Sequence, residues 1–437
     1  MAAGNLIPGG YFGRHPRGGL PEGWTLMTPR PVLAPVFHIT ASRGGRALAA
    51  AGNGREDCVG HVSVPVAIPA GRWYRLAARF RMSSGLNPHR SLLFCIYGKD
   101  FNEGIFRFRR LAGGAVHGEG RFLVSGKGTF EGDVRIYFRH SAHGRAWIES
   151  VTLEECDPVP PRLVRVACTN GSCPLDRWGL VVDAAAAAGA DLVLLPEMIN
   201  GETPEGARGK TPTLLATKAR EHGIYLAGGF YHHECATDTL TNTALLFDRK
   251  GRQAGRYDKN HPYSPEVLKL GVAPGKKAPV FDTPWGRLGL IICYDSWFTD
   301  VTELLALRGA EMVLFPNAGY YRSLMPARAA DNGVWMVASS LGSGAGIWDT
   351  TGAEVTNPDA DPTRFPQHPP AFSKVNKLKV GRIEVLLATL DLSRKVSPHN
   401  WGGPMMSAPG GRRNRRDQTH LLWREIEREA ERWWEEV

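Results

Sequence analysis

The sequence of 437 residues contains no apolar run that reaches the roughly 18 residues needed for a membrane-spanning helix. Its first ten residues lack the basic and the apolar region of a signal peptide, so we expect a cytoplasmic protein that does not contact a membrane. The seven cysteines are scattered, without C-x-x-C pairs or histidine partners at metal-ligand spacing. We therefore expect neither a disulfide framework nor a metal site.

Positive charge is concentrated in the first third of the chain. Residues 1–156 hold 20 Lys and Arg against 11 Asp and Glu, whereas the remainder holds 33 against 32, within a formal net charge of +10. Such an excess attracts polyanions or simply keeps a domain in solution, and the region has no Lys/Arg-rich run. We therefore do not expect nucleic acid as a partner.

The N-terminal region alternates apolar and polar residues in short segments. Between 73 and 151 these segments include WYRLAARFRM, SLLFCIY and VRIYFRH, separated by Gly, Asn, Ser and Pro. Apolar residues at every second position bury one face of a strand, while the intervening arginines stay in water. The pattern predicts an all-β sandwich over residues 1–156, with much of the arginine excess on a solvated sheet face.

Other motifs of this region resemble those of jelly-roll carbohydrate-binding modules. NLIPGG and GLPEGW open the region, and AWIESVTL closes it, so the resemblance covers about residues 5–155. It implies a jelly-roll sandwich and leaves several roles open: binding of a glycan or another polymer, docking, and oligomerisation. We expect Trp24, Trp73 and Tyr97 to lie in the core and not to form a sugar platform.

A proline-rich segment, DPVPP at 157–161, separates this region from the rest, because proline fixes φ and restricts the residue before it. After it, LVRVAC at 163–168 predicts a strand, an Ala-rich stretch at 175–189 predicts a helix, and DLVLL at 191–195 predicts a buried strand. This alternation is typical of an α/β architecture. We therefore place a second, α/β domain at 162–410.

The last residues, 411–437, combine the basic run RRNRR with a charged, amphipathic helix. The apolar residues of this helix recur at steps of three and four: Leu422, Ile426, Ala430, Trp433 and Val437. Such a stripe packs either on its own domain or on another subunit, and the sequence leaves both open.

Three segments of the α/β domain place reactive side chains near predicted strand ends. LLPEM puts Glu197 just past a buried strand, and GRLGLIICYD runs a strand into Cys293 before a predicted helix. The N–H groups at a helix entrance favour a thiolate, although a free cysteine is also often a small core hydrophobe. YDKNHP places Lys259 on a loop that Pro262 and Pro265 are expected to keep from becoming helical.

The order strand-Glu, loop-Lys, strand-Cys resembles the nitrilase superfamily of carbon–nitrogen hydrolases. SPE, followed by APG, resembles the family's second glutamate, at Glu266, and its Pro-Gly. RGAEMVLFPNA and RAADN resemble the next helix, strand and substrate loop and a later helix, whereas SS at 339–340 and GA at 344–345 depart from the family. The resemblance implies a nitrilase-type α-β-β-α sandwich over 162–410, and the departures leave the subfamily open.

The resemblance also implies a catalytic triad of Glu197, Lys259 and Cys293. Hydrolysis would proceed through a thioester, because water is a poor nucleophile and an amide a poor electrophile. Cys293 would attack, Glu197 would move protons, and Lys259 with the N–H of Tyr294 would stabilise the oxyanion. Glu266 would support Lys259 or the leaving group. This chemistry requires no metal or organic cofactor.

The Cys-Tyr-Asp context resembles amidase and carbamoylase branches more than true nitrilases, which predicts a small-molecule amide or N-carbamoyl substrate. Four residues are candidates for the substrate pocket: Tyr263, Trp297, Phe298 and Asn317. Two alternatives stay open, an N-acyltransferase that passes the same thioester to an amine and a catalytically silent binding protein. Family members commonly dimerise through the surface after the catalytic cysteine, which implies a homodimer or higher homo-oligomer.

Overall fold

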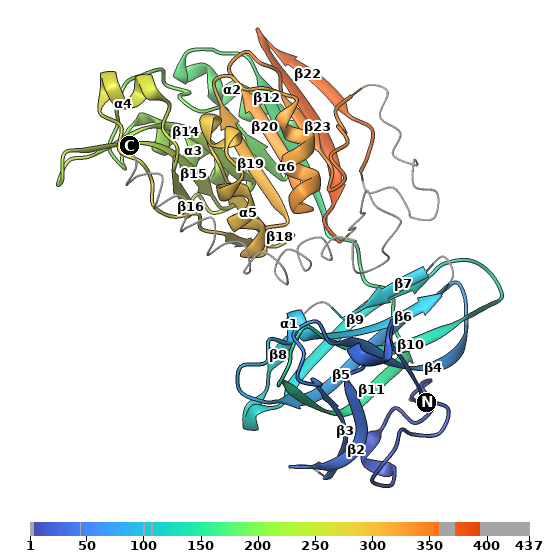
Figure 1. Ribbon diagram of the computed structural model, residues 1–437. Coiled ribbons are helices and arrows are strands. Elements are labelled where there is room, and N and C mark those ends of the chain that lie inside the picture. The colour runs from blue at the N-terminus through green and yellow to red at the C-terminus, as the bar shows by residue number, and fades with distance from the viewer. Residues whose placement is uncertain (1–3, 44, 99–100, 106–107, 358–371, 394–437) are drawn as a thin grey trace. The chain divides into compact units, whose positions relative to one another are not determined.

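The computed structural model describes residues 4–43, 45–98, 101–105, 108–357 and 372–393. The described chain forms two compact units, with the boundary between Val159 and Pro160 (Figure 1). Over the described residues, no helix has the length and apolarity to cross a membrane. The predicted basic segment and amphipathic helix at 411–437 lie outside the described residues.

The first unit consists of two antiparallel β-sheets. The five-stranded sheet has the order β1 (Thr25–Met27), β4 (Val59–Pro69), β10 (Thr129–Arg139), β6 (Leu92–Gly98) and β7 (Phe101–Gly104). The six-stranded sheet has the order β2 (Val36–Ser42), β3 (Gly45–Ala51), β11 (Arg145–Glu155), β5 (Arg72–Met82), β9 (Val116–Val124) and β8 (Phe108–Arg110). One short helical turn, η1 (Phe12–Arg14), precedes the first strand, and three lie between strands: η2 (Pro31–Leu33), α1 (Pro88–Ser91) and η3 (Ala112–Gly114). The all-β prediction for this region is confirmed.

Apolar and polar residues alternate along the strands, and the apolar ones form the core between the two sheets. In β10, Val134, Ile136 and Phe138 are fully buried, whereas the residues between them face outward. The prediction that Trp24 is a core residue is confirmed, since it is 5% exposed. For Tyr97 the core prediction was wrong: its side chain is 39% exposed, because it follows core residue Ile96 and therefore points to the opposite face.

Arginines on the outer face of the six-stranded sheet are paired with glutamates of the neighbouring strand. Arg75 of β5 lies 2.6 Å from Glu154 of β11, and Arg79 lies 2.7 Å from Glu149. Cross-strand pairs of opposite charge stabilise a sheet modestly and keep its outer face in water. The predicted solvated arginine face is confirmed for these strands.

The second unit is built on a sheet of twelve strands. Its main path runs β16 (Gln253–Asp258), β15 (Thr239–Phe247), β14 (Tyr225–Glu234), β13 (Leu192–Leu194), β12 (Leu163–Asn170), β20 (Trp335–Ser340), β19 (Met312–Asn317), β18 (Gly286–Leu290) and β17 (Phe281–Thr283). Strands β21 (Gly346–Trp348), β22 (Asn376–Val380) and β23 (Ile383–Asp391) pair off this path. The central strands run parallel and the outer ones antiparallel, and one residue pair, Asn170 with Ser340, links β12 to β20.

Helices cover the sheet of the second unit, which explains its continuous apolar strands. Helices α2 (Leu175–Ala187) and α3 (Lys210–His222) share one core with β14 and β23, while α5 (Asp300–Leu307) and α6 (Leu324–Asn332) pack into another with β19 and β20. Consecutive residues of β13 divide between the two cores: Leu192 and Leu194 belong to one and Val193 to the other. The mixed α/β prediction for this region is confirmed.

One local prediction near the site was wrong. Pro265 was expected to keep its surroundings free of helix, but α4 (Ser264–Leu270) contains it in its first turn. A proline fits there because the first N–H groups of a helix have no intrahelical partner to lose. Lys259 itself lies in the loop before α4, as predicted.

Candidate active site

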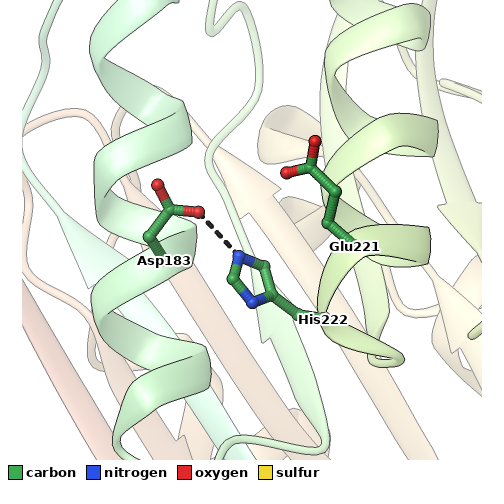
Figure 2. A group of neighbouring side chains, drawn as sticks. All are labelled: Asp183, Glu221 and His222. Atoms are coloured by element: carbon green, nitrogen blue, oxygen red, sulfur yellow. Dashed lines mark hydrogen bonds and ion pairs between the residues drawn. The ribbon is translucent and has the colours of Figure 1, made fainter.

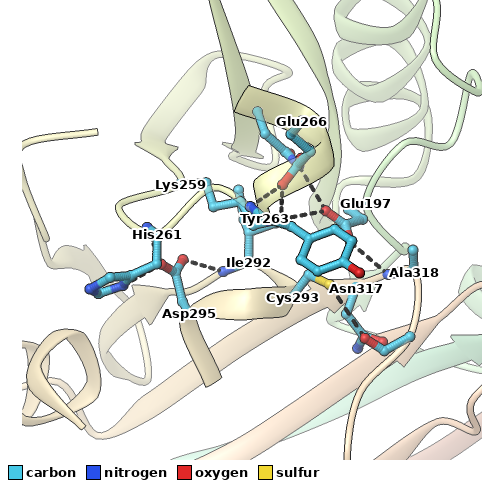
Figure 3. A network of polar contacts seen from close by, with 12 residues as sticks. Glu197, Lys259, His261, Tyr263, Glu266, Ile292, Cys293, Asp295, Asn317 and Ala318 are labelled. Carbon is cyan, nitrogen blue, oxygen red and sulfur yellow. Dashed lines mark hydrogen bonds and ion pairs between the residues drawn. The ribbon is translucent and has the colours of Figure 1, made fainter. Parts of the chain in front are cut away.

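The three predicted catalytic residues follow three different strands and meet at one point, where Glu197 and Lys259 are buried and Cys293 is half-buried (Figure 3). Glu197 lies just past β13, Lys259 just past β16, and Cys293 opens the short helical turn η4 (Cys293–Trp297) after β18. Strand ends in α/β folds place side chains at the sheet edge, where several loops converge. Lys259 Nζ is 3.6 Å from Glu197 Oε2, and Glu197 is close enough to the Cys293 thiol for its charge to raise the pKa of that thiol.

Glu197 is held by donors from two other parts of the sheet. Its Oε1 accepts a 2.7 Å hydrogen bond from the N–H of Ala318, which follows β19, and its Oε2 accepts a 2.8 Å bond from Nδ2 of Asn242 in β15. The residue is 1% exposed. Two bonds and an adjacent ammonium compensate for burial of the carboxylate, which would otherwise be costly.

Lys259 is a buried ammonium between two glutamates. Nζ donates a 2.7 Å bond to Glu266 Oε2, and the residue is 1% exposed. Burial opposes the charged form, but the negative charges of Glu197 and Glu266 outweigh it and raise the pKa of Lys259 above its usual value. The lysine therefore remains a cation at neutral pH, positioned by its partners.

Cys293 combines a strained backbone with a protonated thiol. Its φ is +42°, a left-handed conformation that few side chains adopt, and Met198 beside Glu197 has φ +53°. Such strain often occurs at functional sites. Burial, and then the charge of Glu197, raise the pKa of Cys293, so the expectation that its position would favour a resting thiolate was wrong. The thiol donates to the Gly319 carbonyl at 3.3 Å.

Glu266 and Asn242 complete the buried cluster, the name used below for Glu197, Lys259, Glu266 and Asn242. Nδ2 of Asn242 donates to both glutamates, at 2.8 Å to Glu197 and 2.6 Å to Glu266. Burial disfavours the Glu266 carboxylate, but Lys259 and the hydrogen bonds outweigh it and lower the pKa of Glu266. Asn242 was not identified from the sequence, because an asparagine within a strand has no motif of its own.

A third buried carboxylate, Asp295, joins the lysine loop to the cysteine turn. It is fully buried and accepts hydrogen bonds from the Ile292 N–H at 2.9 Å, the Tyr257 hydroxyl at 2.7 Å and the His261 N–H at 2.8 Å. Burial, together with the charge of Asp295, raises the pKa of Tyr257 far above its usual value, which keeps this hydroxyl a donor. The sequence predicted no role for this residue.

Aromatic side chains gather beside Cys293. Tyr263, Trp297 and Phe298 are 51%, 48% and 38% exposed, and all three rings lie within 6.0 Å of the Tyr294 ring, centroid to centroid. These three residues can contact a ligand that approaches the thiol. For Asn317 the pocket prediction was wrong: it is fully buried, because its Nδ2 donates to the Ser339 carbonyl at 2.8 Å within the sheet.

One group of side chains in the described residues has the spacing of metal ligands: Asp183, Glu221 and His222, on α2 and α3 (Figure 2). His222 Nε2 is 2.6 Å from Asp183 Oδ1. The ammonium of Lys218 already lies 2.8 Å from Asp183 and 2.9 Å from Glu221. A metal ion would have to displace this cation, so these four residues, the exposed cluster below, are better described as surface ion pairs.

Comparisons with known proteins give similarities to one family. The profile described as carbon-nitrogen hydrolase matches residues 172–360, a span that includes Glu197, Lys259 and Cys293. The chain is 32% identical over 180 residues to the omega-amidase NIT2 of Homo sapiens, covering 36% of this chain and 64% of that protein. It is 31% identical over 189 residues to the omega-amidase NIT2-A of Xenopus laevis, covering 38% of this chain and 68% of that protein. The chain thus spans just under two thirds of the human relative.

Two solved structures are similar to the chain over part of its length. Nit3 of Saccharomyces cerevisiae, a member of branch 10 of the nitrilase superfamily, is 23% identical, with a TM-score of 0.43 over 52% of this chain and 90% of that chain. An amidase from Nesterenkonia sp. is 25% identical, with a TM-score of 0.41 over 53% of this chain and 93% of that chain.

Proposed function

The chain belongs to the carbon–nitrogen hydrolase family, and from this premise we propose that it hydrolyses a linear amide or N-carbamoyl group through a thioester on Cys293. The observation that carries the proposal is the convergence of three strand ends on one point, where Glu197 Oε2 lies 3.6 Å from Lys259 Nζ and the charge of Glu197 raises the pKa of the Cys293 thiol. A carboxylate, an ammonium and a thiol at one point supply a proton carrier, an oxyanion stabiliser and a nucleophile.

In the proposed acylation step, the sulfur of Cys293 attacks the carbonyl carbon while its proton passes to Glu197. Glu197 then delivers this proton to the leaving nitrogen as the carbon–nitrogen bond breaks, so ammonia or an amine departs and a thioester remains. The raised pKa of Cys293 supports this order, because a thiol that is protonated at rest needs a base in contact with it at the moment of attack.

In the proposed deacylation step, Glu197 takes a proton from water as the water oxygen attacks the thioester carbon. The tetrahedral intermediate collapses, the carbon–sulfur bond breaks, and the sulfur regains a proton from Glu197 as the acid departs. Lys259 and the N–H of Tyr294 stabilise the oxyanion in both steps. Tyr294 is the second residue of η4, and the first N–H groups of a helical turn lack an acceptor within it.

Glu266 is proposed to position the lysine and not to move protons. Its Oε2 accepts 2.7 Å hydrogen bonds from Lys259 Nζ and from the Tyr263 N–H, and its Oε1 accepts a 3.1 Å bond from the Tyr231 hydroxyl. A carboxylate with this many donors is a fixed anchor. The ammonium is therefore already oriented before substrate binds, which is the condition for efficient oxyanion stabilisation.

The exposed aromatic side chains support a substrate with an apolar part. Tyr263, Trp297 and Phe298 present rings near the thiol, and Trp297 also meets Tyr321 edge-on with centroids 4.8 Å apart. Aromatic rings bury large apolar area against a ligand. We therefore propose amides or ureido compounds whose acyl group is bulkier than acetyl.

The proposal is tested by measuring ammonia release from a panel of amides, ureido acids and nitriles, with Cys293→Ala as the control. Release from amides or ureido acids by the wild-type protein alone is the expected result. Ammonia release from nitriles only would contradict the proposed amide or N-carbamoyl substrate and would assign a nitrile substrate. Formation of an N-acyl product with added amine in place of the acid would assign the acyltransferase reaction instead.

For the first unit we propose a jelly-roll topology, supported by its two antiparallel sheets, with a glycan as one ligand to test. The outer face of its five-stranded sheet presents Tyr97, with the Arg135 guanidinium 3.8 Å from the ring centroid, and Tyr137, with the His61 ring at 4.4 Å. Retention of the isolated unit on polysaccharide columns, lost in Tyr97→Ala, is the supporting result. We also propose that this unit is dispensable for cleavage of small amides.

We further propose a homodimer that buries the surface after the catalytic cysteine. On α5, the helix that follows Trp297 and Phe298, the apolar side chain of Leu304 is 36% exposed, and a second copy of the chain would cover it. Light scattering of the full-length protein at micromolar concentration is expected to give at least a dimer. A monomer would contradict the proposal.

A further inference from the structure

His261 lies beside Asp295 in the active site (Figure 3), and its ring contacts two carboxylates. It follows Lys259 by two residues. Its Nδ1 is 3.0 Å from Asp295 Oδ1 and its Nε2 is 3.2 Å from Asp300 Oδ2. The ring also stacks on Phe298, with centroids 4.1 Å apart and planes inclined by 16°. The lysine loop, the cysteine turn and the start of α5 are therefore joined through one imidazole.

The two contacts determine the protonation state of the ring. An ionised carboxylate only accepts hydrogen bonds, so a ring with both nitrogens on carboxylates must donate from both, and only the imidazolium does so. Burial opposes this charge, but the hydrogen bonds to Asp295 and Asp300 outweigh it and raise the pKa of His261 to about 9. At neutral pH, His261 is therefore a cation.

The partners of His261 differ in how firmly they are held. Asp295 is fully buried, and its Oδ2 is also bound by the Tyr257 hydroxyl and the Ile292 N–H. The side chain of Asp300 is 56% exposed. The bond to Asp295 therefore fixes the imidazole against the cysteine turn, while the bond to Asp300 depends on the charge of the ring.

We propose that His261, as an imidazolium bridging Asp295 and Asp300, is a positioning residue that fixes the Lys259 loop relative to Cys293 in the proposed hydrolysis. It touches no reacting atom in this arrangement. Its effect is geometric: the main chain from Lys259 to His261 is short, so a shift of the imidazole moves the ammonium. A misplacement of about 1 Å in an active site costs on the order of 100-fold in rate.

The inference predicts a pH dependence. The charged and titratable groups around the ring are Asp295 on η4, Asp300 on α5, Tyr257 on β16 and Lys259 on its own loop. Loss of the second ring proton removes the donor to one carboxylate, so the loop loses an anchor as pH rises through about 9. Asp300→Asn removes the counter-charge, so we expect the alkaline limb of kcat to move about one pH unit lower.

The experiment compares His261→Asn with His222→Asn, which removes a different His–Asp contact of the second unit, in the exposed cluster. For His261→Asn we expect kcat to fall about 10- to 100-fold with KM changed less than about threefold. For His222→Asn we expect both constants within about twofold of wild type. Equal kcat in His261→Asn and wild type, or an unmoved alkaline limb in Asp300→Asn, would overturn the inference.

A second readout separates this inference from the proposed function. Alkylation of Cys293 by iodoacetamide needs no amide turnover, and its rate reports how well Lys259 stabilises the thiolate. We expect alkylation at pH 7.5 to be about tenfold slower in His261→Asn than in His222→Asn. If the wild-type protein cleaves no amide, the proposed function fails, and the alkylation rates alone decide the inference. If His261→Asn does not fold, the alkaline limb of alkylation in Asp300→Asn decides it.

Discussion

Two lysines of the second unit are each held between two carboxylates, and only the buried one belongs to the proposed reaction. In the buried cluster, Lys259 Nζ lies 2.7 Å and 3.6 Å from its carboxylates, and in the exposed cluster, Lys218 Nζ lies 2.8 Å and 2.9 Å from its own. The side chain of Lys259 is 2% exposed and that of Lys218 is 21% exposed. The nitrogen–oxygen distances in the two clusters are therefore similar. The clusters differ in the burial of the lysine and in the thiol that adjoins the buried one.

Burial changes how strongly the lysine and its carboxylates interact in the two clusters. Exposed pairs are screened by water and contribute about 0–1 kcal/mol, and both helices that carry the exposed cluster pack through other residues. In the buried cluster, interactions persist in a low dielectric, and the pKa values of Lys259 and Glu266 move apart. A compact charge cluster is therefore weak evidence for a site, unless it is desolvated and adjoins a reactive group.

The largest expected difference concerns two thiols of the second unit, Cys293 and Cys235. Cys293→Ala is expected to lose turnover below detection with its fold intact, because it removes the nucleophile and little volume. Cys235, which is exposed, serves as the matched control, and Cys235→Ala should retain full activity. Turnover comparable to wild type in Cys293→Ala would remove the thioester mechanism.

Removal of each lysine charge separates the two clusters directly. Lys259→Ala should lower kcat on the order of 100-fold or more through the oxyanion, and Lys218→Ala should leave it within about twofold. Glu197→Gln should fail in acylation, whereas Glu221→Gln should not. Steady-state kinetics on one amide measures all four, and a rate within about threefold of wild type excludes that residue of the buried cluster from the mechanism.

The same substitutions should differ in stability. Lys259→Ala leaves two buried carboxylates without their cation, which is expected to cost about 3–5 kcal/mol of the free energy of unfolding. Lys218→Ala is expected to cost about 1 kcal/mol or less. Urea unfolding followed by tryptophan fluorescence measures both. Equal costs would mean that burial does not distinguish the clusters.

The smallest expected effect is a pH dependence of stability. The pKa of His261 is raised from 6.5 to about 9 in the folded protein, so its contribution is fully present below pH 6.5 and is lost as pH rises through about 9. The stability difference between wild type and His261→Asn should therefore be largest below pH 6.5 and shrink towards pH 9. A difference that stays constant from pH 6 to about pH 10 would contradict the imidazolium assignment.

The sequence located the catalytic candidates because strand ends leave a recognisable pattern. Glu197 and Cys293 each follow a short apolar run, and Lys259 lies before a proline, so local pattern and family resemblance agreed on them. Asn242 was not predicted from the sequence, because it lies inside a strand and its partners, two glutamates, are far from it in the sequence. Asp295 escaped for the same reason, since its role depends on contacts with a loop 34 residues away.

Other predictions were wrong because they were based on the residue type alone, whereas the behaviour of the residue depends on its surroundings in the fold. Pro265 is a helix breaker in an interior but a helix starter in the first turn, and the sequence does not show which applies. We expected a thiolate at Cys293 because a helical turn begins there. The fold also buries the thiol and brings the carboxylate of Glu197 near it, which raises its pKa. Asn317 follows a strand in the sequence but faces inward to the backbone of its neighbour.

The most direct test of the account is mass spectrometry of the protein after rapid acid quench during turnover of an amide found in the ammonia screen. The account predicts a mass increase equal to the acyl group on the peptide that contains Cys293, absent in Cys293→Ala and unaffected in Cys235→Ala. Steady turnover with no acyl group on Cys293 at any quench time, or with the acyl group on another residue, would contradict it.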